Sequence, residues 1–326
     1  MAHGYPNVSG IYSPLQKQAW KKVVNAVHEK GGLICAQLWH CGRTAHPSLL
    51  PDQRAPVGPS KITARGETLD SNFNLKQRVE PRQLLQDEID RIVRDYTEAA
   101  RSAIQIGFDA VELHAAHGYL PDQFTNDNSN KRDDKYGGSV KNRCRFTLEV
   151  LDHIIESVGS DKTGVRFSPC GKFNDMDDSD PRATFTYLIG EADKKRLAYI
   201  NITEPSTSHQ LDDTIHPWIS SSSQQVHELE HELNASYWSQ NVIKNTPMIV
   251  AGGVSTDRAA ELVGSGDAEA VAFGRAFIAN PDLPYRIKHA LELNACDVES
   301  LYGGGEKGYI DYPFYGGGTS NDLEFA

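Results

Sequence analysis

The chain has 326 residues, of which 39% are hydrophobic and 24% charged, a composition typical of a globular protein with enough apolar material for a core. Its formal net charge of -11, without a block rich in lysine and arginine, argues against a nucleic-acid surface. No apolar run approaches the ~18 residues of a membrane span. Five cysteines without a CxxC pair, and an N-terminus without signal-peptide features, indicate a cytoplasmic protein without a disulfide framework.

Short apolar segments alternate with amphipathic helical patterns along the chain. The first helix is expected to start at a capping box formed by Ser13 and Gln16, a later one stops at Gly107, and Asn280 with Pro281 opens the last. The segments between helices are short and apolar on both faces, as in the buried strands of a parallel sheet. Six such strands are expected, at residues 33–39, 108–114, 163–169, 197–203, 247–253 and 268–274.

Strand–helix alternation predicts an α/β fold with a parallel sheet covered by helices. The GxGxxG motif of a doubly wound dinucleotide-binding sheet is missing. The segments "AGG" (251–253) and "FGRAF" (273–277) instead suit the phosphate-binding loops after strands seven and eight of a (β/α)8 TIM barrel. By that count the strand at 33–39 is the third. We therefore expect one domain over residues 1–326, with about six of the eight strand–helix units and an N-terminal truncation.

Two histidines and a tyrosine follow the strand at 108–114, in the stretch "HAAHGYLPDQF". Chemistry in a barrel is carried by residues where strands end, so His114, His117 and Tyr119 are expected at the catalytic rim. Two imidazoles there can donate hydrogen bonds to one oxygen and polarise a carbonyl group, and a tyrosine can supply a proton. Taken alone, the two histidines are more simply polar residues that end a strand. A metal site would need a third ligand, which this segment does not obviously supply.

Other strand ends carry compatible residues. The amide of Gln37 can pair as donor and acceptor with the edge of a ring, and Arg166 inside an apolar strand requires an anion or a polar ligand. Internal salt bridges and ordinary turns explain each of these residues singly, but less well all of them at successive strand ends. The last two strands end in residues that suit a phosphate group, namely Gly252, Gly253, Gly274 and Arg275.

This combination resembles the old yellow enzyme family, flavin-dependent ene-reductases that include 12-oxophytodienoate reductases. The matching stretches occur in family order and cover nearly the whole chain. They are "GIYSPLQKQAWKKVVNAVHEKGGLICAQLWHCGR" (10–43), "PVGPS" (56–60), "GFDAVELHAAHGYLPDQF" (107–124), "RDDKYGGSVKNRCRFTLEVLDHIIESVG" (132–159), "GVRFSP" (164–169), "AGGVS" (251–255), "AFGRAFIANPDL" (272–283) and "GYIDYP" (308–313).

The resemblance implies that FMN lies across the barrel mouth. Gln37 corresponds to the glutamine at the pyrimidine edge of the flavin, and Arg166 to the arginine beside flavin N1 and O2. The phosphate is implied at Gly252, Gly253, Gly274 and Arg275. Family members begin with about two more strand–helix units that contact the flavin. We therefore expect weakened flavin binding in this chain and an open barrel seam. Either the sequence is incomplete, which we put first, or a partner or self-association covers the seam.

For the substrate, the resemblance implies that His114 and His117 grip the carbonyl oxygen of an activated alkene. Tyr119 is implied as the proton donor, and Trp39 and Tyr302 as parts of the pocket wall. The reaction implied is reduction of the carbon–carbon double bond of an α,β-unsaturated carbonyl compound. The hydride passes from NADPH through FMN to the β-carbon, and a proton reaches the α-carbon from the opposite face.

Three alternatives stay open. The stretch "HELEH" (227–231) matches a zinc-hydrolase motif in which His227 and His231 bind metal and Glu228 is the base, although a solvated helix surface explains it better. A non-catalytic barrel remnant would keep the fold without the chemistry. Another phosphate-binding barrel, such as an aldolase, would need a lysine that the six strand segments lack.

Two further segments stand out by composition. Residues 205–225 are polar and rich in serine, and are expected to form a long loop over the active face. Residues 314–326 are expected to be a disordered tail.

Overall fold

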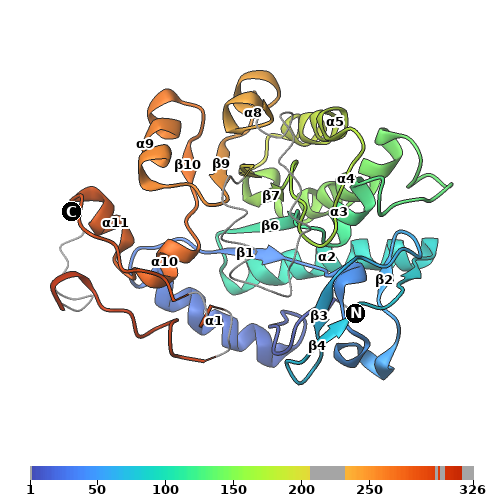
Figure 1. Cartoon of the computed structure of the whole chain (residues 1–326), viewed down its shortest axis with the longest axis horizontal. Helices are drawn as coiled ribbons and strands as arrows, with labels where there is room; N and C mark the ends of the chain where they lie inside the picture. Colours follow the sequence, from blue (N-terminus) through green and yellow to red (C-terminus); the bar gives the residue numbers. More distant parts are fainter. Residues whose placement is uncertain (1, 206–231, 298–299, 302–304, 318–326) are drawn as a thin grey trace.

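A computed structural model describes residues 2–205, 232–297, 300–301 and 305–317 of the chain (Figure 1). Six strands form one sheet in the order β1-β6-β7-β8-β9-β10, and all neighbouring strands are parallel. Each lies within one of the six segments that the sequence predicts, except that β6 runs one residue further. Their bounds are β1 Cys35–Leu38, β6 Ala110–Ala115, β7 Thr163–Phe167, β8 Tyr199–Thr203, β9 Met248–Ala251 and β10 Ala270–Val271.

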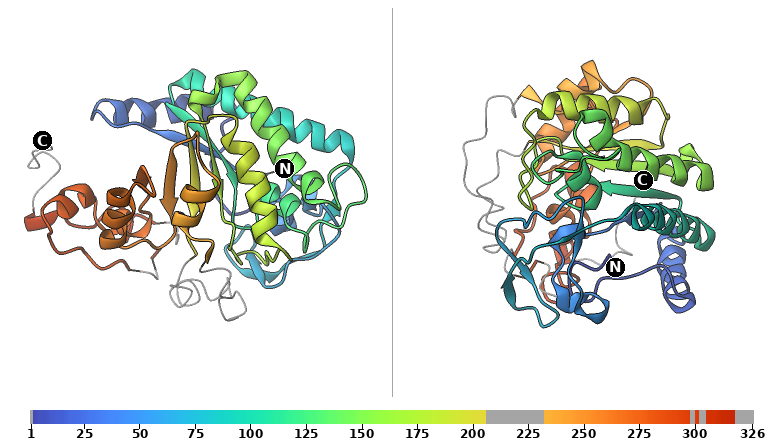
Figure 2. Two further views of the ribbon diagram at one scale, coloured as in Figure 1. Left: turned by 90° about the horizontal axis from the view of Figure 1, so that it is seen from above. Right: turned by 90° about the vertical axis from the view of Figure 1, so that its right-hand side faces the viewer.

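Helices cover one side of this sheet, and α1, α2, α4 and α5 lie side by side along it (Figure 2). The longer helices are α1 Pro14–His28, α2 Gln86–Ile106, α4 Val140–Val158, α5 Pro181–Asp193 and α9 Thr256–Ser265. The shorter ones are α3 Leu120–Thr125, α8 Ala235–Asn241, α10 Arg275–Ala279 and α11 Leu283–Lys288. Short 3-10 turns occupy η1 Gly42–Thr44, η2 Pro47–Leu49, η3 Pro51–Gln53, η4 Ser160–Lys162 and η6 Tyr315–Gly317.

Local sequence signals explain where most helices begin and end. The Ser13 hydroxyl accepts a hydrogen bond from the backbone N–H of Gln16 at 3.2 Å, and the Gln16 side chain accepts from the Ser13 N–H at 2.9 Å, which confirms the capping box. Helix α2 ends at Gly107, whose φ of 109° suits glycine. The prediction that Asn280 and Pro281 open the last helix is wrong. Helix α11 begins at Leu283, after Asp282.

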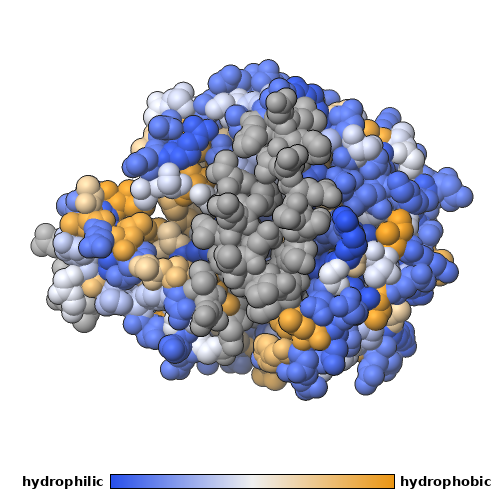
Figure 3. Space-filling model, viewed as in Figure 1, coloured by the Kyte–Doolittle hydropathy of each residue, from blue (hydrophilic) through white to orange (hydrophobic). Residues whose placement is uncertain are grey.

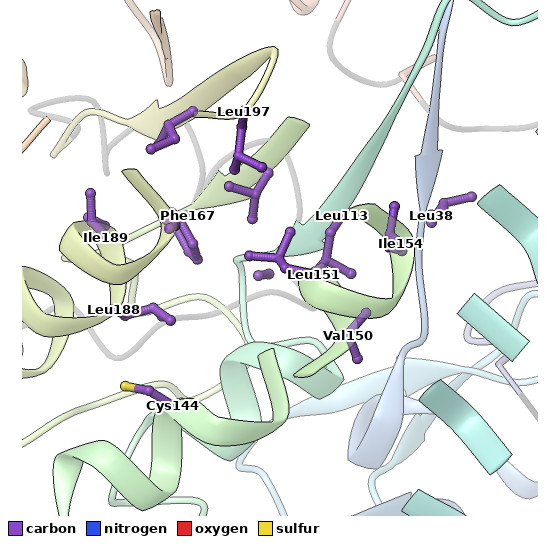
Figure 4. Close-up of a cluster of buried hydrophobic side chains, with 14 of the residues drawn as sticks. Leu38, Leu113, Cys144, Val150, Leu151, Ile154, Phe167, Leu188, Ile189 and Leu197 are labelled. Atoms are coloured by element: carbon purple, nitrogen blue, oxygen red, sulfur yellow. The ribbon is translucent and has the colours of Figure 1, made fainter. Parts of the chain in front are cut away.

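The core lies between the sheet and these helices. On β6, β7 and β8 the apolar residues alternate, so that Val111, Leu113, Val165, Phe167 and Ile200 are completely buried. Figure 4 shows how leucine, isoleucine and valine side chains from helices α4 and α5 pack against this face of the strands. Burying one such side chain contributes roughly 1.5–3 kcal/mol to stability, so packing on the helical side of the sheet stabilises the fold. The alternate strand positions face the other side and carry the polar residues.

Two small sheets between β1 and α2 were not predicted from the sequence. Strand β2 Val57–Gly58 pairs in parallel with β5 Arg82–Gln83, and β3 Glu67–Leu69 forms an antiparallel hairpin with β4 Leu75–Gln77. In the turn of this hairpin the Asp70 carboxylate accepts the backbone N–H groups of Asn72 at 2.8 Å and Asn74 at 2.9 Å. These elements are too short to show a period of two.

The expected six-stranded sheet is confirmed, and within the described residues β1 and β10 form its two edges. No helix among these residues is both long and apolar enough to cross a membrane. Nearly all of the loop expected at 205–225, and most of the tail expected at 314–326, lie outside the described residues, so both stay predictions. The single-domain assignment likewise stays a prediction.

Candidate active site

The turn after β6 is strained and firmly held. His117 adopts a φ of 56° and Gly118 a φ of 69°, both in the left-handed region. The His117 N–H donates to the Ser168 hydroxyl at 2.8 Å, its carbonyl accepts from the Asn174 amide at 2.9 Å, and the Gly118 N–H donates to the Asp122 carboxylate at 2.8 Å. A histidine–glycine turn that three side chains hold in an uncommon backbone conformation is typical of a functional position.

Four of the predicted site residues form one aromatic cluster at the carboxyl end of the sheet. The ring of His114 lies 5.5 Å from that of His117 and 5.0 Å from that of Tyr119, and Trp39 packs edge-on against Tyr119 at 5.0 Å. Tyr5 completes the cluster, with its ring stacked on Trp39 and its hydroxyl 3.3 Å from the Tyr119 hydroxyl. Sequence reasoning missed Tyr5, because no helical or strand pattern surrounds it.

Burial controls the charge of this cluster. Burial first, and then the nearby Arg166 guanidinium, lower the pKa of His114 to about 3. Burial, then Arg166, hold the pKa of His117 well below its usual range. Burial and the neighbouring Tyr5 raise the pKa of Tyr119 well above its usual range. At neutral pH both imidazoles are therefore neutral, each with one N–H to donate, and the phenol keeps its proton.

Arg166 lies on β7 in register with His114 of β6 and Asn201 of β8. Its Nε donates to the Thr203 hydroxyl at 3.4 Å, and that hydroxyl lies 3.3 Å from Nε2 of His117. The guanidinium is thus linked to His117 through one shared hydroxyl. Thr203 was also missed in the sequence.

Gln37 is the edge-strand member of a second polar group. Its amide Nε2 donates to the carboxylate of Glu112 at 2.5 Å, and the same carboxylate accepts from the Asn201 amide at 3.1 Å. Sequence reasoning missed Glu112 and Asn201. They share a period of two with His114 and Thr203 along β6 and β8, and this alternation was the signal that could have revealed them.

The predicted phosphate residues follow β9 and β10 at the same end of the sheet. Gly252 has a φ of 102° and Gly253 a φ of 74°. A Cβ on Gly252 would lie 2.8 Å from a methyl carbon of Thr203 and 3.1 Å from the carbonyl oxygen of Glu204, so only glycine fits there. Gly274 caps α10 and Arg275 is its first residue.

Four sequence predictions fall wholly or mostly on residues that the structure does not describe. Tyr302 and the "HELEH" stretch at 227–231 are among them, as are residues 206–225 of the expected loop. In the described part of the chain, no group of three or more histidine, cysteine, aspartate or glutamate side chains could hold a metal ion.

Comparisons with known proteins show the family of the chain. Residues 1–294 match the NADH:flavin oxidoreductase / NADH oxidase family. The flavin oxidoreductase hxnT of Emericella nidulans is 40% identical over 325 residues, which cover 96% of this chain and 81% of that protein. The 12-oxophytodienoate reductase 1 of Oryza sativa subsp. japonica is 38% identical over 315 residues, which cover 96% of this chain and 77% of that protein.

Solved structures confirm the predicted TIM-barrel fold class. Morphinone reductase superposes with a TM-score of 0.86 at 38% identity, over 100% of this chain and 83% of that one. An old yellow enzyme homologue from Zymomonas mobilis superposes with a TM-score of 0.85 at 35% identity, over 96% of this chain and 82% of that one. The chain therefore belongs to the NADH:flavin oxidoreductase / NADH oxidase family and is an FMN-dependent NAD(P)H oxidoreductase of the old yellow enzyme type.

Proposed function

We propose that this enzyme reduces the carbon–carbon double bond of α,β-unsaturated carbonyl compounds, with NADPH as hydride donor and FMN as carrier. The observation that supports this most directly is the convergence of His114, His117 and Tyr119 in one cluster, in which His114 and Tyr119 are buried. Two neutral N–H donors beside a protonated phenol match the needs of a carbonyl oxygen that gains charge and a neighbouring carbon that gains a proton.

The residues present fit FMN. Gln37 offers a donor and an acceptor, Arg166 brings a positive charge, and Oδ1 of Asn201 is buried without a hydrogen-bond partner among the described residues. Gly252, where only glycine fits beside Thr203 and Glu204, lies at the strand end to which the phosphate is assigned. When bound, FMN supplies the hydride-transfer chemistry that side chains lack. We assign its phosphate to Gly252, Gly253, Gly274 and Arg275.

The histidine pair is assigned to the substrate oxygen. Nδ1 of His114 is buried and has no hydrogen-bond partner among the described residues, so it is ready for a ligand. On His117, Nε2 faces the Thr203 hydroxyl, which accepts from Arg166 and can donate its own proton to Nε2. This arrangement favours a proton on Nδ1 of His117, where it can be donated to the same oxygen.

Tyr119 is assigned as the proton donor because its phenol is protonated and lies beside His114. Trp39 packs against Tyr119 and is assigned to the pocket wall. Tyr302 is proposed for the same wall on the strength of the family resemblance alone.

A spectroscopic titration tests the proposal. Purified protein is examined by absorbance before and after addition of FMN, then reduced without oxygen by NADPH or NADH, and finally mixed with 2-cyclohexenone. We expect a protein-bound flavin band that is bleached faster by NADPH than by NADH and restored by the enone. A bound flavin that the enone does not reoxidise would favour the alternative of a barrel without ene-reductase activity.

We further propose that the chain associates with a second copy through its exposed barrel edge. Leu15 and Val23 of α1 and Leu33 beside β1 are 77%, 44% and 82% exposed, and a groove of about 630 Å³ runs between Lys22 and Gly32. At the other edge, Figure 3 shows hydrophobic surface over α11, where Ile287 is exposed.

We also propose a cytoplasmic location, which the five free thiols of the chain support.

A further inference from the structure

A buried carboxylate lies where the flavin's pyrimidine edge is assigned. Glu112 is 6% exposed and lies in register with Gln37 of β1 and Gly164 of β7. Oε1 of Glu112 accepts from Nε2 of Gln37 at 2.5 Å, and Oε2 accepts from Nδ2 of Asn201 at 3.1 Å. Within the described part of the chain, Glu112 forms no ion pair with a lysine, arginine or histidine.

An ionised carboxylate can only accept hydrogen bonds, so it determines which way its amide partners turn. Each amide must present its nitrogen to Glu112, which directs its oxygen elsewhere. Oδ1 of Asn201 is accordingly buried without a hydrogen-bond partner among the described residues. A buried acceptor without a donor is uncommon in folded proteins and marks a place where a ligand N–H belongs.

Tyr199 lies beside the same carboxylate. Burial and the Glu112 charge raise the pKa of its phenol, and its hydroxyl lies 3.2 Å from the sulfur of Cys35. The ring covers Gly164, where a Cβ would lie 2.5 Å from the ring carbon that bears the hydroxyl. Glu112 is therefore enclosed by neighbours that donate to it or pack beside it, and it keeps a defined position.

We propose that Glu112 is a positioning residue that makes the site selective for a flavin with a hydrogen on N3. It holds Gln37 and Asn201 with their amide nitrogens directed at its carboxylate. Their amide oxygens therefore point away from the carboxylate and can accept a hydrogen bond from the flavin. The flavin's pyrimidine edge has one ring N–H, at N3, between two carbonyl oxygens. This proposal rests on the assignment of that edge to Gln37.

The test compares FMN with 3-methyl-FMN, in which a methyl group replaces the N3 hydrogen. Both are titrated into flavin-free protein, and binding is followed by the loss of flavin fluorescence. Wild-type protein is expected to bind FMN about five- to tenfold more tightly than 3-methyl-FMN, because one hydrogen bond is worth about 1–1.5 kcal/mol. In Glu112→Gln, where an amide no longer fixes its neighbours, this preference falls toward unity.

Two control variants separate this role from a general loss of binding. Glu149→Gln makes the same change on α4, where Glu149 accepts from the Tyr136 hydroxyl at 2.7 Å, and is expected to keep the wild-type preference. Arg275→Ala is expected to weaken both flavins equally, since it acts at the phosphate. If Glu112→Gln does not fold, Gln37→Leu replaces it, and the preference must again be lost.

The outcomes are distinct. Wild-type protein that binds FMN but does not discriminate against 3-methyl-FMN overturns the role of Glu112 and leaves the flavin site intact. A preference that survives in both Glu112→Gln and Gln37→Leu does the same. Wild-type protein that binds neither flavin overturns this proposal together with the FMN assignment.

Discussion

The hydroxyl of Tyr119 lies 3.3 Å from that of Tyr5, although 114 residues separate them in the chain. Both rings contact Trp39, and Tyr119 alone also packs against His114. The pair thus contains an inner phenol beside the histidines and an outer phenol behind it. Under the proposed assignment of His114 to the substrate oxygen, only the inner phenol lies beside the substrate.

We therefore predict different effects for the two tyrosines. Tyr119→Phe should slow reoxidation of the reduced flavin by an enone by about 10²–10⁴-fold, the usual contribution of a general acid, and leave reduction by NADPH unchanged. Tyr5→Phe, as the matched control, should slow enone reduction by less than about tenfold, since one neutral hydrogen bond is lost. Stopped-flow absorbance measures the two half-reactions separately. Equal loss of both half-reactions in Tyr119→Phe would contradict its role.

The histidine pair makes a second prediction, on ligand binding. His114→Ala and His117→Ala should each weaken the binding of a para-substituted phenol by roughly 10–100-fold, because a hydrogen bond to a charged oxygen is worth about 1.5–3 kcal/mol. The affinity for FMN should stay within about threefold of wild type. Titration of the flavin-loaded protein, followed by its absorbance spectrum, gives both values. His153→Ala, on the exposed surface of α4, is the control and should change neither.

Buried histidines also predict how stability depends on pH. Burial lowers the pKa of His40 and His114 to about 3 and that of His117 well below its usual range, so these groups stay neutral in the folded protein. The unfolded chain protonates them near pH 6.5, and stability is therefore lost as pH falls below that value. Burial raises the pKa of Asp122 to about 7. Asp122 therefore binds one proton in the folded state, and this proton offsets the one that the unfolded chain gains at one histidine.

The unfolded chain therefore binds about two more protons than the folded protein. Between pH 6 and 5 this lowers the free energy of unfolding by about 2.7 kcal/mol per pH unit. Urea denaturation at pH 7, 6 and 5 measures this slope. His114→Asn should reduce it by about half, and His153→Asn, at an exposed position, should leave it unchanged. If the unfolding free energy of the wild type does not change with pH in this range, water reaches these histidines and the prediction is wrong.

The exposed edge makes a prediction about assembly. Val23→Glu places a charge in the groove of α1 and should shift the protein toward monomer in light scattering across a dilution series. Lys17→Glu, on the same helix, is the control for added negative charge. If the wild-type protein is monomeric at every concentration, the proposal of self-association is wrong.

The sequence was sufficient for the six strands of the main sheet and for some of the polar residues near their ends. The six strands alternate with helices that have clear caps, and His114, Arg166 and Gln37 stand out because polar groups interrupt apolar runs. Glu112 was missed although it is on the same face as His114, because its role depends on the partner strands and not on its own segment. Tyr5 could not be found from pattern at all, since its place is set by stacking on Trp39.

The hairpin β3–β4 was missed for a related reason. Its strands have three residues each, too few for an alternating pattern, and Asp70 rather than a glycine-containing tight turn organises the connection. Arg78, which follows β4, donates to the Asn174 side chain at 2.6 Å and so supports the turn at His117. Contacts of this kind join segments about 100 residues apart, and local propensity does not encode them.

The turn at Gly118 makes the last prediction. A Cβ there would lie 2.5 Å from Cβ of Asn174 and 2.7 Å from the carbonyl oxygen of Phe173, at a φ of 69° that a side chain disfavours. Gly118→Ala should therefore displace His117 and reduce both unfolding stability, by roughly 1–3 kcal/mol, and phenol binding.

Gly264→Ala is its matched control, because Gly264 lies inside α9 with nothing within 4 Å of an added Cβ. Alanine is favoured over glycine in a helix, so this variant should gain roughly 0.5–1 kcal/mol and bind phenols as wild type does. Urea denaturation and phenol titration of the two variants side by side measure the contrast. If Gly118→Ala retains wild-type stability and phenol affinity, the backbone after β6 has room to rearrange, and the strained turn does not position His117.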